Sequence, residues 1–454
     1  MKRNILFLVA IIFAAGFLPG TSLFAQTSRT ITLQEAIDLS ISNSNQLKNS
    51  QAKIEEATAA LREAVERKLP EVAISASHLR LNSPNVNLKT KTTTTTPSTG
   101  GGTTTEEAQG DPSSATYAMA NVSLPIYSGL RIKYGIESSK YLEEAAKLDA
   151  QNDREAVILN TINAFDNLYK ARSAVDLVNE NLAGARQRVK DFSNLEKNGI
   201  LPRNDLLKAE LQQSNVELSL LDAENNWRLA NINMNLMLGL ADSTVLAVNE
   251  ADLQSPAEQL KGVEDFVQLA IQNRKDVAAL SLRRKAAGTA VKVAKGAQYP
   301  SVAITGGYVA ADVPNVLTVS NAVNIGVGVQ YSLSSLWKNA GMDEARAREK
   351  QVAANEDILN DAVRLQVNQS YQNYLLNKKK IEVYQTAIAQ AEENYKIVRN
   401  KFENQLANTT DLLDADVAQL QARLNAAFAK ADAAVAYTKL LQTSGLLTNQ
   451  TQTK

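Results

Sequence analysis

The chain carries two copies of one pattern, and this duplication limits its architecture more than any other feature of the sequence. Ile-Ser-Asn at 41–43 recurs as Ile-Gln-Asn at 271–273, and Leu-Pro-Glu-Val-Ala-Ile at 69–74 recurs as Tyr-Pro-Ser-Val-Ala-Ile at 299–304. Both recurrences have a shift of 230 residues, from 41 to 271. Duplicated units of long helices and short strands favour a symmetric, oligomeric assembly over an enzyme with one pocket.

The shift between the copies becomes smaller later in the chain. Asp-Leu-Leu-Lys-Ala at 205–209 recurs as Asp-Leu-Leu-Asp-Ala at 411–415, a shift of 206 residues from 205 to 411. The first copy contains an additional Thr-rich stretch near 91–105. A segment of this composition cannot bury apolar surface. We therefore expect a long, mobile loop over 82–116.

The N-terminus predicts export from the cytoplasm. Lys2 and Arg3 precede an apolar run over 5–17, and Leu-Phe-Ala at 23–25 forms a small-residue cleavage site, which together predict a signal peptide over 1–25. The sequence has no cysteine for a disulfide, a lipid anchor or a metal. Removing Lys2 and Arg3 from 48 basic residues leaves 46 against 48 acidic ones, so we expect no nucleic-acid partner.

Helical periodicity dominates the sequence after this peptide. Between Leu130 and Lys197 there is no proline, and the only glycines are Gly135 and Gly184. Apolar residues here follow the 3-4-3-4-3 spacing of a coiled-coil seam: Val175, Val178, Leu182, Ala185, Val189 and Phe192. The seam recurs 206 residues later, at Ile381, Tyr384, Ile388, Ala391, Tyr395 and Val398. A helix of roughly 100 Å at about 1.5 Å per residue argues against the alternative, an ordinary amphipathic helix in a globular core.

After each long helix, the chain is expected to turn and to return as a second, antiparallel helix. Asn-Gly-Ile-Leu-Pro at 198–202 stops the first helix, and Arg203 begins the next. The second turn falls within 404–411. The returning helices carry two apolar sets: Leu207, Leu211, Leu218 and Leu221 in the first copy, and Leu413, Val417, Leu420, Leu424 and Ala427 in the second. We predict two antiparallel hairpins with tips at 198–205 and 404–411.

Four segments alternate apolar and polar residues as strands do, namely 72–81, 116–126, 301–310 and 321–331. Each is about ten residues, the length of a tilted strand that crosses a bilayer, although soluble hairpins are the alternative. No run of 18 apolar residues follows the signal peptide, so a membrane-spanning part would have to be a closed barrel. The smallest membrane barrels have about eight strands, so closure requires several copies.

The predicted organisation has five parts. They are the signal peptide 1–25, a first repeat 26–240 with its loop 82–116 outside the cell, a connector 241–262, a second repeat 263–445 and a polar tail 446–454. Each repeat contributes helices, two strands and one hairpin tip.

In this order and duplication the sequence resembles the TolC-like outer-membrane efflux family, over essentially all of the chain after the signal peptide. The residues that carry the resemblance are Thr-Leu-Gln-Glu-Ala-Ile at 32–37, Leu-Pro at 69–70, Leu-Pro-Ile-Tyr-Ser-Gly at 124–129, Asn-Gly at 198–199 with Asp205, and Asp-Leu-Leu-Asp-Ala at 411–415. The resemblance implies a mainly α fold with a small antiparallel β part.

It further implies a homotrimer in which duplicated hairpins form an α-helical barrel in the periplasm. This barrel continues into a 12-stranded outer-membrane β-barrel, four strands from each chain, in contact with outer-membrane lipid. The implied function is a passive exit duct of a tripartite efflux or secretion system, working with a periplasmic adaptor (membrane fusion) protein and an inner-membrane pump.

Catalytic chemistry is not expected. His78 is the only histidine, so neither a triad nor a His or Cys metal site can form. Gly-Gly-Gly at 100–102 lies in the Thr-rich loop, away from any strand-to-helix junction where a phosphate loop would lie. We therefore expect no enzyme activity and no cofactor.

The residues expected to act are carboxylates. Asp411 and Asp414 are three apart and share one helix face, although acidic residues in a first turn also stabilise a helix without any other role. The resemblance implies that this pair lines the pore at its periplasmic constriction and that Asp205 helps to hold the hairpins shut. It also implies a basic partner, for which Lys430 and Arg203 are candidates. Another basic residue of the family is replaced by Ala407.

Two other classes of protein fit parts of the sequence. A periplasmic adaptor or a surface coiled-coil protein would also have long hairpins, but an adaptor would carry a β-domain between its hairpin helices and would not repeat. A secreted hydrolase would need catalytic groups that the sequence does not offer.

Overall fold

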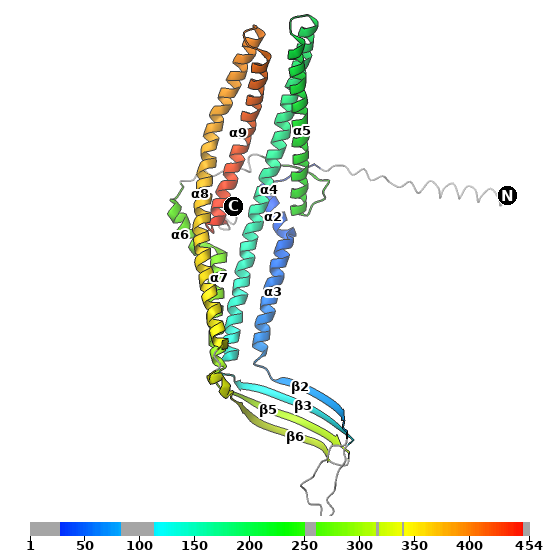
Figure 1. Ribbon diagram of the computed structural model, residues 1–454, viewed down its shortest axis with the longest axis vertical. Coiled ribbons are helices and arrows are strands. Elements are labelled where there is room, and N and C mark those ends of the chain that lie inside the picture. The colour runs from blue at the N-terminus through cyan, green and yellow to red at the C-terminus, as the bar shows by residue number, and fades with distance from the viewer. Residues whose placement is uncertain (1–27, 83–112, 250–259, 315–316, 338–339, 448–454) are drawn as a thin grey trace, which may run out of the picture. The chain divides into compact units, whose positions relative to one another are not determined.

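The computed structural model describes residues 28–82, 113–249, 260–314, 317–337 and 340–447 (Figure 1). The predicted signal peptide and most of the predicted loop 82–116 lie outside these ranges. The chain divides into two units, which we call the hairpin unit (Met1–Ser44, Ala156–Leu260, Gln369–Gln442) and the strand unit (Asn45–Glu155, Lys261–Asn368, Thr443–Lys454). Within the described ranges, every helix is too short or too polar to cross a membrane.

Two pairs of long antiparallel helices supply the hairpin unit. The first pair is α4 (Arg131–Lys197) with α5 (Arg203–Leu238), and the second is α8 (Ala340–Glu403) with α9 (Thr409–Thr443) (Figure 1). The predicted long helices are thereby confirmed, since α4 has 67 residues and α8 has 64. The second turn occupies 404–408 and is shorter than predicted, because α9 begins at Thr409 rather than at Asp411.

The two predicted seams differ in burial. Most of the first seam is buried: Val178, Leu182, Ala185 and Phe192 are at most 5% exposed. Val178 and Leu182 pack with Val216 of α5, and Leu420 of α9 covers them. The second seam is only half-buried along its length.

The prediction for the returning helix α5 is partly wrong. Its leucines at 207, 211, 218 and 221 are 48–64% exposed, whereas Leu206, Ala209 and Val216 face α4. A helix has about 3.6 residues per turn, so a face shifted by one residue points about 100° away. Because Leu206 and Leu207 are adjacent, the sequence alone could not show which face of α5 is buried. The leucines at 207, 211, 218 and 221 stay exposed and could contact another partner.

A two-stranded parallel sheet packs against the first hairpin at the end opposite its tip. Strand β1 (Ser28–Thr30) pairs with β4 (Val245–Ala247), and the helix α2 (Leu33–Asn43) follows β1. Ile31, between β1 and α2, shares one core here with residues of α4, α5 and β4: Phe165, Leu168, Met234, Leu238 and Leu246. The sequence predicted no element in the connector 241–262, because a strand of three residues is too short to show alternation.

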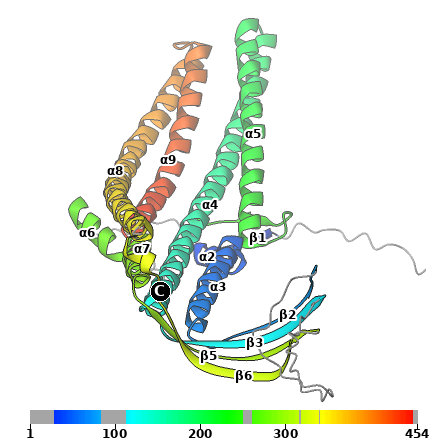
Figure 2. The same ribbon diagram turned by 60° about the horizontal axis from the view of Figure 1, so that its bottom comes forward.

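The strand unit contains a four-stranded antiparallel sheet (Figure 2). Its strands are β2 (Glu71–Arg80), β3 (Ser114–Tyr127), β5 (Ser301–Val313) and β6 (Leu317–Gln330), in the order β2-β3-β5-β6. All four predicted strands are confirmed, with small shifts at their ends. Besides the first parts of α4 and α8, this unit contains the helices α3 (Asn45–Glu66), α6 (Val263–Asn273), α7 (Lys275–Gly296) and the short η2 (Leu333–Leu336).

The register separates the sheet into two faces of different chemistry. Over 72–74, 120–124, 302–308 and 323–329, one face is apolar and carries Val72, Ile74, Ala120, Val122, Leu124, Val302, Ile304, Tyr308, Val323, Ile325, Val327 and Val329. The opposite face is small or polar and carries Ala73, Ser75, Asn121, Ser123, Ala303, Thr305, Gly307, Asn324, Gly326 and Gly328. The apolar side chains of β6 are 68–86% exposed, so one chain leaves this face uncovered.

The ends of the returning helices repeat one packing motif. Gly239, after α5, has a φ of 70°, and a Cβ atom there would lie 2.8 Å from the side chain of Asn43. Gly445, after α9, has a φ of 69°, and a Cβ atom there would lie 2.9 Å from the backbone of Asn273 and Arg274. These pairs follow the two shifts in the sequence, from 43 to 273 and from 239 to 445. The predicted polar tail 446–454 includes a buried residue, Leu447.

Candidate functional site

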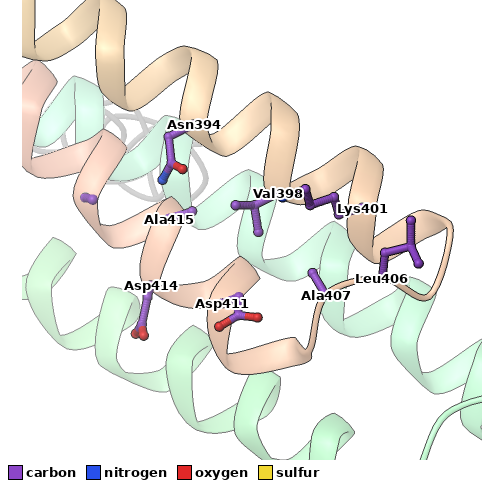
Figure 3. A pocket seen from close by; sticks show the side chains of 9 residues that line it. Asn394, Val398, Lys401, Leu406, Ala407, Asp411, Asp414 and Ala415 are labelled. Carbon is purple, nitrogen blue, oxygen red and sulfur yellow. The ribbon is translucent and has the colours of Figure 1, made fainter.

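The second hairpin tip places two carboxylates on one exposed side of α9. Asp411 and Asp414 are both exposed and project from the same side of the helix (Figure 3). They border a groove of about 490 Å³ between α8 and α9. Its lining residues are Asn394, Val398, Lys401, Leu406, Ala407, Asp411, Asp414, Ala415 and Ala418.

Asp411 also stabilises the start of its helix. Its Oδ2 accepts a hydrogen bond of 3.2 Å from the backbone N–H of Asn408, and the Asn408 Oδ1 accepts one of 2.9 Å from the backbone N–H of Asp411. This reciprocal pair satisfies two N–H groups that the first turn leaves open. Asp414 makes no hydrogen bond or ion pair to any other described residue. Unlike Asp411, Asp414 therefore does not stabilise the start of α9 through a side-chain hydrogen bond.

Asp205 lies at the start of α5 and is bound by a residue that the sequence reasoning missed. Lys208 Nζ lies 3.1 Å from Asp205 Oδ1 and donates a hydrogen bond of 3.4 Å to Thr410 Oγ1 on α9. Lys208 therefore connects the two hairpin tips within one chain. The spacing of three between Asp205 and Lys208 was a readable signal for this contact.

The two predicted basic partners lie elsewhere. Arg203, the first residue of α5, is exposed and forms no ion pair with the rest of the described chain. Lys430 is exposed on α9. It follows Asp411 by 19 residues, or roughly 28 Å at about 1.5 Å per residue, so one chain does not bring it to the tip. Ala407, where the resemblance implied a basic residue, lines the groove.

Ion pairs join α4 to α9 behind the tip. They are Arg188 with Asp416, Glu180 with Arg423, and Lys170 with Asp432. Lys170 Nζ also lies 2.7 Å from Asp166 Oδ2 within α4. The sequence did not show these pairs, because their members are more than 200 residues apart and the seam pattern counts only apolar positions.

Four groups in this array have raised pKa values, namely Asp166, Lys170, Arg188 and Arg423. Burial lowers the pKa of Arg188, but hydrogen bonds and charge from Asp416 more than offset this, so the pKa is raised overall. Burial raises the pKa of Asp166, Lys170 opposes the shift, and the nearby Asp432 adds to it. The Asp166 Oδ1 is buried without a hydrogen-bond partner among the described residues, which shows why its ionised form is disfavoured.

Chemical groups for catalysis do not converge in the described ranges. No cluster of three His, Cys, Asp or Glu side chains suited to a metal occurs there. The single histidine, His78, is exposed on β2, with its Nδ1 2.8 Å from Thr116 Oγ1.

The chain belongs to the outer membrane efflux protein family, whose sequence profile matches residues 36–240 and 266–446. Outer membrane efflux protein BepC of Brucella suis biovar 1 (strain 1330) is 21% identical over 333 residues, which are 71% of this chain and 70% of BepC.

Solved structures of outer-membrane proteins share the fold. The protein VceC of Vibrio cholerae matches with a TM-score of 0.72 and 17% identity, over 91% of this chain and 96% of VceC. The channel MtrE of Neisseria gonorrhoeae, solved in its open state, matches with a TM-score of 0.71 and 15% identity, over 92% of this chain and 89% of MtrE.

Family membership settles the broad function. The protein is an outer-membrane efflux channel that extends into the periplasm, and it is not an enzyme. The resemblance read from the sequence is confirmed, as is the mainly α fold with a small antiparallel sheet. The alternatives of an adaptor, a surface coiled-coil protein and a secreted hydrolase are not compatible with this membership.

Proposed function

We propose that three copies of this chain form the passive exit duct of a tripartite efflux or secretion system, gated at the periplasmic end by Asp411 and Asp414. The observation that carries the gate is the position of the two carboxylates, exposed on one side of α9 beside the groove at the hairpin tip. Three-fold symmetry turns the pair into two rings of three carboxylates, which attract cations.

The unpaired edges of the sheet support assembly. Strands β2 and β6 each have one edge without a partner, and exposed edges of this length are templates for pairing with another chain. Three sheets of four strands supply twelve, enough for a membrane barrel, whereas four are fewer than the minimum of about eight.

The two hairpins support the same assembly. The exposed face of α5 carries Leu207, Leu211, Leu218, Leu221, Leu229 and Leu236. Within the hairpin unit, α8 exposes Leu375, Leu376, Val383 and Ile397. A contact between two different faces of identical chains closes into a ring when the rotation permits it. We infer that α5 of one copy packs against α8 of the next.

Side chains near the sheet support a place in the lipid bilayer. Its apolar face is bare, and exposed aromatic residues stand where the strands meet the helices, namely Tyr127, Tyr299, Tyr331 and Trp337. Tyrosine and tryptophan are enriched at membrane–water interfaces, because their rings are apolar and their polar atoms reach water. We infer that these residues mark the periplasmic edge of the membrane-spanning barrel.

The tips are the surface that we propose for the periplasmic adaptor. Ile200 and Leu406, one at each tip, are 60% and 77% exposed, as expected of apolar residues that a partner covers. We infer that an inner-membrane pump supplies the energy for transport. Asp205, Arg203 and Lys430 stay candidates for contacts that close the gate between copies.

Planar-bilayer conductance tests the gate. In Asp411→Asn with Asp414→Asn, the charges are lost but the amide oxygen at 411 still accepts the hydrogen bond of Asn408. We expect cation selectivity and block by millimolar divalent or trivalent cations to weaken, with trimer formation unchanged. Asp222→Asn, an exposed position on α5, is the control. Wild-type selectivity and block in the double variant would show that the gate lies elsewhere.

A further inference from the structure

The two faces of the four-stranded sheet exchange their chemistry along the strands. In the half nearest the helices of the strand unit, one face is apolar and the other is small or polar, as described above. In the half towards the far ends of the strands, the first face becomes polar and the second becomes apolar. The register places this exchange at one level of the sheet, beside a row of three alanines: Ala76, Ala118 and Ala310.

Beyond the alanines, the face that began as apolar carries a polar row across all four strands. The register aligns His78, Thr116, Asp312 and Thr318. His78 Nδ1 lies 2.8 Å from Thr116 Oγ1, and Thr318 Oγ1 donates a hydrogen bond of 2.8 Å to Asp312 Oδ1. Arg80 follows two residues after His78 and therefore lies on the same face. Such a row suits water and lipid headgroups, because polar groups are costly to place in hydrocarbon.

The opposite face becomes apolar at the same level. Met119 pairs with Val309, and Tyr117 pairs with Ala311, whose partner on β6 is Val319. We call the larger apolar side chains of this face the apolar collar; they are Leu79, Tyr117, Met119, Val309, Leu317 and Val319. The two leucines are 46% and 55% exposed, and the other four residues are half-buried. One chain therefore leaves the collar partly uncovered.

A β-bulge places the collar residues of β6 on this face. Residues 320 and 321 of β6 together oppose Ala310 of β5, and Asn321 has a left-handed φ of 57°. An extra residue in one strand shifts its alternation by one position. Leu317 and Val319 consequently face away from the side that Val323 occupies, although strict alternation would put all three on one face.

The exchange of faces falls near the outer boundary of the bilayer in the proposed barrel. On β5 the apolar stretch runs from Val302 to Ala310, which is roughly 26 Å at about 3.3 Å per residue. A strand tilt of about 40° reduces this to about 20 Å across the membrane, against roughly 25 Å for the apolar band of a membrane barrel. The side that carries Val302 faces lipid in this barrel, so the collar faces the lumen at its outer end.

Three copies close the collar into a ring. Leu79 lies on β2 and Val319 on β6, which are the two edge strands of the sheet. Pairing of β2 with β6 of the next copy therefore joins the collars of neighbouring chains. The lumen of a membrane barrel is ordinarily polar, and a contiguous apolar patch that faces water marks a binding surface. Because the ring lines the lumen, molecules in transit through the pore reach it.

We propose that the apolar collar is a binding site for the apolar body of small molecules that leave through the pore. Tyr117 offers a flat apolar ring, and Met119 offers a flexible, polarisable side chain, so the site adapts to ligands of different shapes. The proposal rests on the proposed duct and adds a class of cargo to it, namely molecules with an apolar body.

Block of the pore by tetraalkylammonium ions in planar bilayers tests the proposal. Tetramethylammonium and tetrabutylammonium carry the same charge and differ in apolar surface. Added on the outer side, tetrabutylammonium is expected to block the wild-type trimer at a severalfold lower concentration. Tyr117→Ser with Met119→Ser removes the two largest side chains of the collar on β3. We expect this variant to weaken block by tetrabutylammonium severalfold and to leave block by tetramethylammonium unchanged.

A matched control and a milder variant lie on the same face. Asn121→Ser changes a polar residue of β3 nearer the helices and is expected to leave block by both ions unchanged. If the double serine variant does not assemble, Val309→Thr with Val319→Thr keeps the β-branched shape of both side chains and adds a hydroxyl group to each. It is expected to weaken block by tetrabutylammonium in the same direction by less.

The outcomes separate the collar from the duct and from the gate. If the serine and threonine variants respond to tetrabutylammonium as Asn121→Ser does, the collar is overturned, whereas the gate depends only on the result for Asp411→Asn with Asp414→Asn. Equal block of the wild type by both ions would show that another part of the chain covers the collar, and would also overturn the proposal. If the wild-type protein forms no conducting trimer, the duct fails and the collar fails with it.

Discussion

The two hairpin tips form the same turn with different chemistry. Residues 199 and 405, separated by the shift of 206, both have a left-handed backbone, with φ of 70° at Gly199 and 61° at Gln405. The helix after the first turn is preceded by Pro202, which offers no side-chain cap, whereas the helix after the second has the reciprocal hydrogen bonds of Asn408 and Asp411. The backbone path is thus common to both copies. The second tip, which carries the proposed gate carboxylates, forms the same turn with a non-glycine residue in the left-handed region and with a polar cap.

The seams behind the tips differ in a second way. Helix α4 packs against both α5 and α9, while the corresponding seam of α8 stays half-exposed. The same spacing of apolar residues therefore marks an interior helix in one copy and a flanking helix in the other. The apolar spacing of α4 and α8 is the same because each helix packs against a partner helix along its seam. The arrangement of the four long helices decides how much of each seam is buried.

The largest expected effect comes from a charge in each seam. Leu182 is 1% exposed, so Leu182→Asp is expected to lower the free energy of unfolding by about 3–5 kcal/mol and to abolish the SDS-resistant trimer. Ile388→Asp, at the matching half-buried position, is expected to lower it by about 1–2 kcal/mol. Thermal unfolding in detergent and gel migration without heating measure both. Equal losses would show that the seams are equally covered in the assembly.

The next effect concerns the glycines that end α5 and α9. A Cβ atom at Gly445 would lie 2.9 Å from the backbone of Asn273 and Arg274, which cannot yield, whereas one at Gly239 would meet the side chain of Asn43. Both substitutions to alanine should lower the free energy of unfolding by about 1–3 kcal/mol, with Gly445→Ala the larger. The shift in thermal midpoint checks this order. A larger shift for Gly239→Ala would mean that Asn43, which bonds to Leu238, is as fixed as backbone.

Exchanging the left-handed residues of the two turns, Gly199 and Gln405, should change the free energy of unfolding in opposite directions. Gly199→Gln forces a side chain into the left-handed region and is expected to lower the free energy of unfolding by about 1 kcal/mol. Gln405→Gly relieves the same strain and should raise it by less than about 1 kcal/mol, because glycine also gains freedom in the unfolded chain. Thermal midpoints of the two variants are the measurement. Destabilisation by Gln405→Gly would show that the Gln405 side chain contributes a contact of its own.

The smallest expected effect is on pH dependence. Asp166 of the first copy is buried where the second copy has the exposed Gln372, at the same shift of 206. Because its pKa is raised on folding, the protonated form favours the folded state at low pH, and that contribution is lost as the pH rises from about 3.9, the unfolded value, through the folded one. Asp166→Asn should reduce the dependence of the free energy of unfolding on pH above about 3.9. Thermal unfolding between acid and neutral pH tests it, with Gln372→Asn as the control.

The sequence was sufficient for every feature that depends on local spacing. The duplication with its two shifts, the long helices, the first turn and the four strands all follow from apolar period, glycine and proline, and these are properties of neighbouring residues. The family resemblance added the outer-membrane channel, which the comparisons confirm. Asp411 and Asp414 could be singled out because they are three residues apart on one helix.

Only the tertiary structure decided which face of α5 is buried, how far each seam is covered and which charges meet. Leu206 and Leu207 are adjacent and equally apolar, so spacing alone could not choose between them. Lys208 reaches Thr410, and Arg188 reaches Asp416, across more than 200 residues of sequence. Their pairing is set by the packing of the first hairpin, α4 and α5, against α9, because helices that are remote in sequence come into register only when the whole hairpin unit folds.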